Sequence, residues 1–281
     1  MRDYFCGWYF KCQTESDTIA VIAASHRYGG GRSNSVQIIT EDASRTVFLP
    51  YDALKNEPSG FRVGHSRFTK GGISLDLRDG DFSAVGRLVF GPLTPLEYDI
   101  MGPFKYVPFM ECRHSVKSMS HTVYGEIDIC GKKHNFSGAR GYIEGDRGHS
   151  FPSNYLWTHT FFDGGSLMLS IADIPLGVSN FRGVIGVICY RGRRWRIATY
   201  LGARIAHIRD GAATVRQGNR ELTVRLIKQH SFPLAAPTHG NMSRAIHESA
   251  CCVAAYTFKI GDNTVFSFET DKASFENEWH R

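Results

Sequence analysis

Short apolar runs separated by turn residues fill this chain, and they constrain its fold more than any other feature. Candidate strands are residues 19–23, 36–40, 73–77, 84–90, 123–129, 167–172, 184–190, 195–200, 222–227 and 254–259. Turn signals such as Arg209-Asp210-Gly211 stand between the runs, as hairpins and meanders require. Because no long stretch has the helical period, we predict an all-β chain of antiparallel sheets, either a sandwich or a barrel.

Two halves of ordinary domain size account for the length of 281 residues. We place them at residues 1–150 and 151–281, and we expect them to pack tightly because no flexible linker separates them. Residues 91–108 contain four prolines, too many for a central strand, so this segment is predicted to be a surface loop.

The composition is that of an ordinary globular protein, with 42% hydrophobic and 12% aromatic residues. The net charge of +6 is modest and its basic residues are scattered, which argues against nucleic-acid binding but is compatible with peripheral contact to an anionic membrane. No stretch approaches the roughly 18 apolar residues of a spanning helix, and no signal peptide is evident. The seven cysteines lack paired spacing and are expected to be reduced, so we expect a cytoplasmic protein.

Acidic and phenolic side chains alternate in one extended stretch. If it is a strand, Tyr142, Glu144 and Asp146 share one face, so two carboxyls and a phenol point the same way. Burial of one carboxyl beside another raises one pKa and supplies an acid. The alternative is structural, with Glu144 paired to Arg140 or Arg147 and Asp146 capping a turn.

Ring side chains alternate along the next predicted strand. Tyr155, Trp157, His159 and Phe161 share one face, which is either ordinary core or the wall of an aromatic pocket that stabilises a cation. A histidine in such a position is more often a hydrogen-bonded core residue than a catalyst. The other histidines lack ligand spacing, so we expect no metal.

A third stretch mixes charged and nucleophilic groups. Glu111 and Arg113 share one face of an extended chain, as an ion pair or as part of a cavity wall, and Cys112 and His114 share the other. Cys112 and His114 could form a nucleophile and base, although no third orienting group is evident. The aromatic N-terminal stretch is predicted to be a buried strand, with Trp8 in the core or in the pocket of the ring stripe.

Several of these motifs, taken in order, resemble the tocopherol cyclase-like family. They are residues 7–11, Gly102-Pro103-Phe104, residues 108–114 with Ser118-Met119, and residues 141–152 with Trp157. The family is similar to the carotenoid hydratase-like proteins, so the resemblance implies a pair of lipocalin-like β-barrel or sandwich halves.

The resemblance also implies an enzyme that protonates a prenyl or terpenoid double bond, the cation being captured by an internal nucleophile or by water. It implies no cofactor. Glu144 and Asp146 would be the proton donor and its partner, with Glu111 and His114 as alternates. The residues that would bind the hydrophobic substrate are Trp8, Tyr106, Phe109, Met110, Tyr142, Tyr155, Trp157 and His159.

Four positions depart from the family pattern. Cys6 stands where glutamate is common, Arg147 where tryptophan is common, Tyr155 where another aromatic residue stands, and His159 where glutamine is usual. The departures at Cys6, Arg147 and His159 motivate a second hypothesis, a non-catalytic lipocalin-like carrier of a hydrophobic small molecule. In either case the partner is an apolar small molecule; the sequence predicts neither its identity nor the oligomeric state.

Overall fold

The computed structural model describes residues 3–107, 110–176, 179–229 and 232–279, and it divides the chain into two compact units. Unit 1 comprises Met1–Asp99, Cys112–Phe151 and Leu234–Ala245. Unit 2 comprises Ile100–Glu111, Pro152–Pro233 and Ile246–Arg281. Among the described residues there is no α-helix, only the short 3-10 turns η1 (Tyr51–Ala53), η2 (Gly102–Tyr106) and η3 (Thr199–Leu201).

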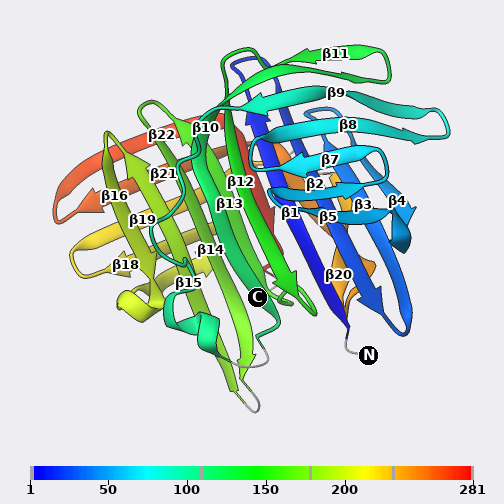
Figure 1. Ribbon diagram of the computed structural model, residues 1–281. Helices are drawn as coiled ribbons and strands as arrows, with labels where there is room; N and C mark the ends of the chain where they lie inside the picture. The colour runs from blue at the N-terminus through cyan, green and yellow to red at the C-terminus, as the bar shows by residue number, and fades with distance from the viewer. Residues whose placement is uncertain (1–2, 108–109, 177–178, 230–231, 280–281) are drawn as a thin grey trace. The chain divides into compact units, whose positions relative to one another are not determined.

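Unit 1 is built on one antiparallel sheet with the order β4-β3-β2-β1-β12-β10-β9-β8-β7-β6-β5, and β11 pairs with β10. Its strands are β1 (Tyr4–Gln13), β2 (Thr18–Tyr28), β3 (Gly31–Ile39), β4 (Ser44–Pro50), β5 (Leu54–Glu57), β6 (Gly60–Val63), β7 (Ser66–Thr69), β8 (Gly72–Asp79), β9 (Phe82–Phe90), β10 (Cys112–Ile129), β11 (Lys132–Asn135) and β12 (Ala139–Gly148). In Figure 1 the blue strands β3 to β1 continue into the green strands β12 and β10 and then into the cyan strands β9 to β7.

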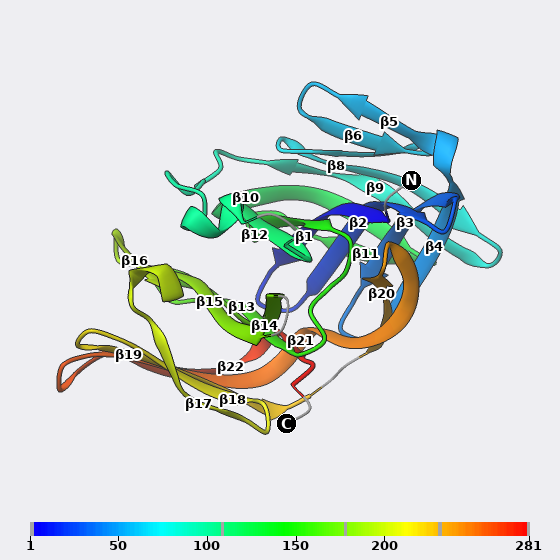
Figure 2. The same cartoon turned by 90° about the horizontal axis from the view of Figure 1, so that it is seen from below.

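The sheet of unit 1 curls on itself. Seen from below, the β5–β6 and β8–β9 strands lie over β1, β2 and β3 (Figure 2). Apolar side chains fill the concave face, where the ring of Phe10 lies 6.0 Å from that of Phe68 and 6.1 Å from that of Phe90. Successive side chains of a strand point to opposite faces, so every second residue contributes to this core and the residues between them lie on the other face of the sheet.

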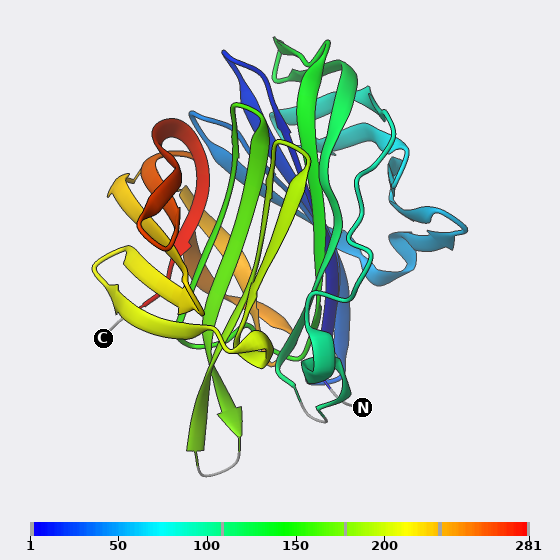
Figure 3. The same ribbon diagram turned by 90° about the vertical axis from the view of Figure 1, so that its left-hand side faces the viewer.

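Unit 2 repeats the same strand order, β16-β15-β14-β13-β22-β21-β19-β18-β17. Strand β20 (Phe232–Thr238), whose residues from Leu234 onward belong to unit 1, pairs with β21. Its other strands are β13 (Tyr155–Phe162), β14 (Gly165–Leu176), β15 (Ser179–Tyr190), β16 (Arg193–Ala198), β17 (Arg204–Arg209), β18 (Ala212–Gln217), β19 (Arg220–Lys228), β21 (Asn241–Ile260) and β22 (Asn263–Asn277). The β14–β15 hairpin projects beyond the neighbouring strands of this unit (Figure 3).

The turn chemistry read from the sequence is confirmed in unit 2. Asp210 and Gly211, with φ of 53° and 73°, connect β17 to β18 in the left-handed conformation that a tight hairpin needs. The core of the unit includes Leu156, Tyr256 and Phe258, all fully buried. Every predicted strand overlaps an observed one.

Two segments belong to a different unit from the residues that flank them in the sequence. The proline-rich stretch that was predicted to be a loop passes into unit 2 at Ile100, whose carbonyl oxygen accepts a hydrogen bond from the Tyr200 hydroxyl at 2.8 Å. In unit 1, Ala235 exchanges two hydrogen bonds of 3.1 Å with the Gln37 amide. The boundary near residue 150 falls at a change of unit, but each unit also takes a segment from the other half.

The prediction of an all-β, lipocalin-like barrel or sandwich architecture is confirmed. In the part of the chain that the structure describes, no helix has the length and apolar character needed to cross a membrane.

Candidate active site

Strands β10 and β12 bring three of the predicted acid–base residues together in unit 1. In the register of these strands His114 lies directly opposite Asp146, and Val116 lies opposite Glu144. Directly opposed residues share a face of the sheet. The other face of β12 carries Ile143, which belongs to the hydrophobic core, so the carboxylates point away from that core.

The imidazole of His114 lies between the two carboxylates. Its Nδ1 is 2.9 Å from Asp146 Oδ1 in a hydrogen bond. Its Nε2 is 3.2 Å from Glu144 Oε2, close enough for an ion pair although the angle falls outside hydrogen-bond limits. The side chains of His114 and Glu144 are 10% and 6% exposed and that of Asp146 is 22% exposed, so little water screens these contacts.

Tyr142 completes the chain of contacts from the same strand. Its hydroxyl donates a 2.6 Å hydrogen bond to Glu144 Oε2, and the ring is fully buried. Asp146, His114, Glu144 and Tyr142 therefore form a continuous series of proton-holding groups, which we call the acid cluster. The predicted shared face of Tyr142, Glu144 and Asp146 is confirmed.

The charges of the acid cluster follow from its surroundings. Burial by itself lowers the pKa of the His114 imidazole, but the adjacent Glu144 and Asp146 carboxylates outweigh it, and the pKa of His114 lies well above its usual value. Burial, together with the Glu144 carboxylate, raises the pKa of the Tyr142 phenol well above its usual value. At neutral pH His114 is thus an imidazolium and Tyr142 an un-ionised donor.

The structural alternative for the two carboxyls is wrong. Glu144 contacts Tyr142 and His114 instead of Arg140 or Arg147, and Asp146 lies within β12 rather than at a turn. Both ring nitrogens of His114 face carboxylates, so the imidazole is not placed to act as the base for a Cys112 nucleophile. The Cys112 thiol donates to Asp146 Oδ1 at 3.4 Å and not to the imidazole.

The residues of the acid cluster include a set that could hold a metal ion. The ligand atoms of His114, Glu144 and Asp146 lie within 4.8 Å of one another. In the observed ring orientation, however, each carboxylate faces a different nitrogen on opposite edges of the imidazole. These ligand types suit a divalent cation, so the expectation that the protein holds no metal stays a prediction.

Strand β1 presents two different faces. Trp8, a predicted substrate-binding residue, packs against the core of unit 1 with its ring 5.4 Å from that of Phe61. The neighbouring residues Tyr9 and Lys11 are paired in register with Glu144 and Tyr142 and so share the face of the acid cluster. Lys11 is fully buried. It was not predicted as a site residue, although it lies between the core residues Phe10 and Cys12 and therefore points to the opposite face.

The predicted ring stripe lies in unit 2. Tyr155, Trp157, His159 and Phe161 are all buried on β13, on the face opposite to Leu156, which belongs to the core of that unit. The His159 and Phe161 rings meet edge to face at 4.7 Å. The shared face is confirmed; the approach of these rings to the carboxylates of unit 1 stays a prediction.

The remaining predicted residues fall on the segment of unit 2 around η2. Tyr106 is 77% exposed, with Lys105 Nζ 4.9 Å above its ring, whereas Met110 is buried. Glu111 precedes β10 and is not part of the acid cluster. Phe109 lies outside the described residues.

Among the described residues, three buried carboxyls were not predicted from the sequence: Asp173, Glu276 and Glu278. Glu276 on β22 accepts a 2.6 Å hydrogen bond from the Tyr155 hydroxyl, and both residues are buried. The sequence did contain a pattern that could have indicated Glu276, because this residue follows the core residue Phe275 just as Glu144 follows the core residue Ile143. The contact between Glu276 and Tyr155 could not be predicted, because the sequence does not show that β22 pairs with β13.

Comparisons with known proteins show which solved structures share this fold. No protein-family model matches the chain, and no curated protein matches it in sequence. Among solved structures, kievitone hydratase from Nectria haematococca is 8% identical with a TM-score of 0.58, covering 98% of this chain and 89% of its own. CghA in complex with Sch210972 is 10% identical with a TM-score of 0.59, covering 99% and 89%.

A third solved structure, a Nitrosomonas europaea protein provisionally named AttH, is 10% identical with a TM-score of 0.57, covering 99% of this chain and 93% of its own. At such low identity the likeness is one of fold, and no match links the chain to tocopherol cyclases in particular. The chain therefore shares, over nearly its whole length, the fold of a group of proteins that includes a hydratase.

Proposed function

We propose that this protein is a cofactor-independent hydratase or cyclase that protonates a carbon–carbon double bond of an apolar prenyl or terpenoid substrate. The observation that carries the proposal is the acid cluster, in which a buried imidazolium is held between two carboxylates and a phenol. Such a series of groups can deliver and recover a proton, which is the only catalytic event that the addition requires. The likeness to kievitone hydratase supports this class of reaction only through the shared fold.

Each member of the acid cluster has a role in this scheme. His114 passes its Nε2 proton to Glu144 Oε2 across the 3.2 Å contact, and the neutral Glu144 carboxyl gives that proton to one alkene carbon. The π electrons form the new C–H bond and leave a cation on the other carbon. A lone pair of water, or of an internal hydroxyl in a cyclase, forms the C–O bond. The oxygen then loses a proton to the Glu144 carboxylate, and Glu144 returns that proton to His114 Nε2, which restores the starting state.

Asp146 and Tyr142 act as positioning residues. The hydrogen bond from His114 Nδ1 to Asp146 keeps the imidazole oriented after its other nitrogen has lost a proton. The Tyr142 hydroxyl holds Glu144 Oε2 in place and stabilises the carboxylate between proton transfers.

The carrier hypothesis has less support from the fold. A lipocalin-type carrier encloses its ligand inside the barrel, whereas apolar side chains of unit 1 and of unit 2 pack against one another in their respective cores. Nothing in a carrier requires a buried imidazolium between carboxylates. The two hypotheses differ in one measurable respect, since a carrier returns its ligand chemically unchanged.

Incubation with prenylated hydroquinones and with geraniol in deuterium oxide tests the proposal. We expect a hydrated or cyclised product that carries one new carbon-bound deuterium, detected by mass spectrometry and NMR. Glu144→Gln should lower the rate by roughly 100-fold or more, because the acid is removed while the shape is kept. Glu126→Gln is the matched control, since this carboxylate contacts Lys133 on the surface of the same unit. Recovery of every probe unchanged would contradict the proposal in favour of a carrier.

A further inference from the structure

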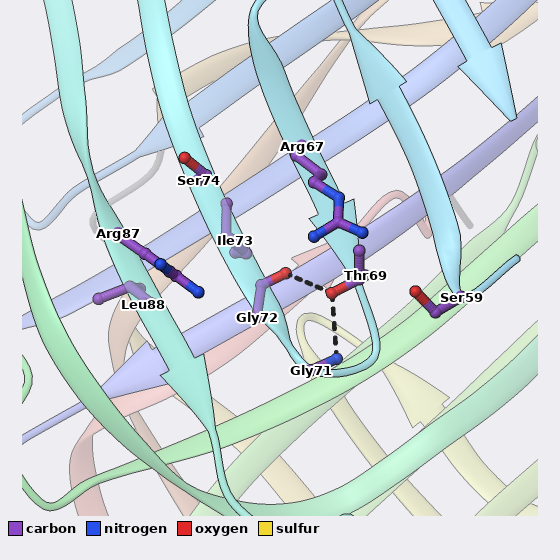
Figure 4. A pocket seen from close by; sticks show the side chains of 9 residues that line it. All are labelled: Ser59, Arg67, Thr69, Gly71, Gly72, Ile73, Ser74, Arg87 and Leu88. Carbon is purple, nitrogen blue, oxygen red and sulfur yellow. Dashed lines mark hydrogen bonds between the residues drawn. The ribbon is translucent and has the colours of Figure 1, made fainter. Parts of the chain in front are cut away.

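A surface pocket on unit 1 lies apart from the acid cluster. It has a volume of about 490 Å³ and is lined by β7, β8 and β9. Figure 4 shows Arg67 and Arg87 on either side of β8, with Ser74 and Gly72 between them. None of the described residues that line the pocket is acidic.

The register of the strands explains why a pocket forms here. Arg67, Ser74 and Arg87 are directly opposed on three consecutive strands, so they form one row on the same face. Neighbouring strands are about 4.8 Å apart, which places the two arginines on either side of a short serine. The other face of these strands carries the core residues Phe68, Ile73 and Leu88, so the floor of the pocket is firmly packed.

Gly72 extends the pocket toward an apolar edge. A Cβ atom at Gly72 would lie 2.2 Å from the Leu88 carbonyl oxygen, so no side chain can stand there. Val89 is opposite Gly72 and remains 46% exposed, next to Tyr124, which is 51% exposed. A row of cations therefore adjoins a small apolar strip on the same face.

The two arginines differ in their charge balance. Arg67 is bound to Glu57 through its Nε. Within the described residues the guanidinium of Arg87 has no hydrogen bond or ion pair, and Glu126, opposite it on β10, contacts Lys133 at 3.2 Å. Arg87 thus offers an uncompensated, planar set of donors, the group best suited to a carboxylate or a phosphate.

We propose that this pocket binds a small organic oxyanion, a carboxylate or phosphate monoester joined to an apolar group. Arg87 and Arg67 hold the anion above Ser74, and Val89 and Tyr124 contact the apolar part. Nothing in this proposal depends on the chemistry of the acid cluster.

Titration of the protein with hexyl phosphate and with hexanoate, followed by amide NMR, tests this assignment. We expect shifts centred on Gly71 to Ser74 and Arg87, and tighter binding than that of inorganic phosphate or of hexanol alone. Arg87→Gln should weaken binding by about tenfold or more. Arg78→Gln is the matched control, because this exposed arginine is also on β8 but does not line the pocket. The amide spectrum of each variant reports its folding.

Val89→Ser separates the two halves of the site. It should weaken binding of hexyl phosphate and leave that of inorganic phosphate unchanged. Failure of both soluble probes to bind, or equal binding by Arg87→Gln, would overturn the proposal. Sedimentation with vesicles of phosphatidic acid in phosphatidylcholine, without binding of soluble hexyl phosphate, would replace the small ligand with a membrane surface.

Discussion

Each unit carries a buried carboxylate hydrogen-bonded to a tyrosine, at the same place in its sheet. In unit 1 Glu144 lies on β12, which pairs with the first strand β1, and in unit 2 Glu276 lies on β22, which pairs with the first strand β13. The hydroxyl–carboxylate distance is 2.6 Å in both pairs, with Tyr142 and with Tyr155. The carboxylates thus lie on equivalent strands, but Tyr142 is on the same strand as its carboxylate, whereas Tyr155 is on the neighbouring strand.

The difference lies in what surrounds the pair. Among the described residues, His114, Glu144 and Asp146 form the one group of three histidine, cysteine or acidic side chains that meet within 4.8 Å. Glu276 has no place in such a group. A hydrogen-bonded carboxylate alone is a stable structural element; the addition of an imidazolium and a second carboxylate makes a centre that can exchange protons.

Removal of the imidazolium should have the largest effect on stability. His114→Leu removes the cation that lies between the Glu144 and Asp146 carboxylates, and we expect a loss of about 3–5 kcal/mol in the free energy of unfolding. Denaturant titration measures it. His207→Leu, at an exposed position, should change stability by no more than about 0.5 kcal/mol.

A compensated variant checks the cause. Addition of Glu144→Gln and Asp146→Asn to His114→Leu removes the repulsion, so part of the lost stability should return. Equal stability of the single variant and the unchanged protein would show that the imidazolium is not balancing these charges.

The pair in unit 2 should contribute less. Tyr155→Phe keeps the ring and removes one hydrogen bond to a buried carboxylate, for an expected loss of about 1.5–3 kcal/mol. Denaturant titration under the same conditions gives the comparison. If this variant were destabilised as much as His114→Leu, the two clusters would not differ in the way described.

The smallest effect is the dependence of stability on pH. The folded protein holds the His114 proton more tightly than the unfolded chain, because the folded pKa is raised. This contribution is fully present below about pH 6.5 and is lost as the pH rises through the folded pKa, by at most about 1.4 kcal/mol per pH unit. His114→Leu should lack this component, and Tyr155→Phe should keep it. NMR titration of the imidazole checks the pKa directly; a midpoint at or below 6.5 would contradict the ion pairing.

Local alternation was enough to predict much of the acid cluster. Tyr142, Glu144 and Asp146 share a face because side chains in a strand alternate, and this pattern needs no knowledge of neighbouring strands. Cys112 and His114 share a face for the same reason. The sequence could not show that β10 lies beside β12, so His114 was only an alternate for the acid role.

Pairing between distant strands explains what the sequence did not predict. Glu276 and Tyr155 are separated by 121 residues, and only the closure of β22 on β13 brings them into contact. Trp8 was expected in the core or in the substrate pocket; its ring packs against the core of unit 1, and its role in substrate binding stays a prediction. The hydrogen bonds between Ala235 and Gln37 connect segments with no sequence pattern in common.

The segment Leu234–Ala245 has a consequence for the order in which the protein is made. Unit 1 takes this segment from near the end of the chain, so a ribosome must synthesise most of unit 2 before unit 1 has all its parts. The two units cannot mature strictly one after the other. A nascent chain that stops before residue 234 would leave Gln37 without its late partner, and unit 1 would await completion as the final strands emerge.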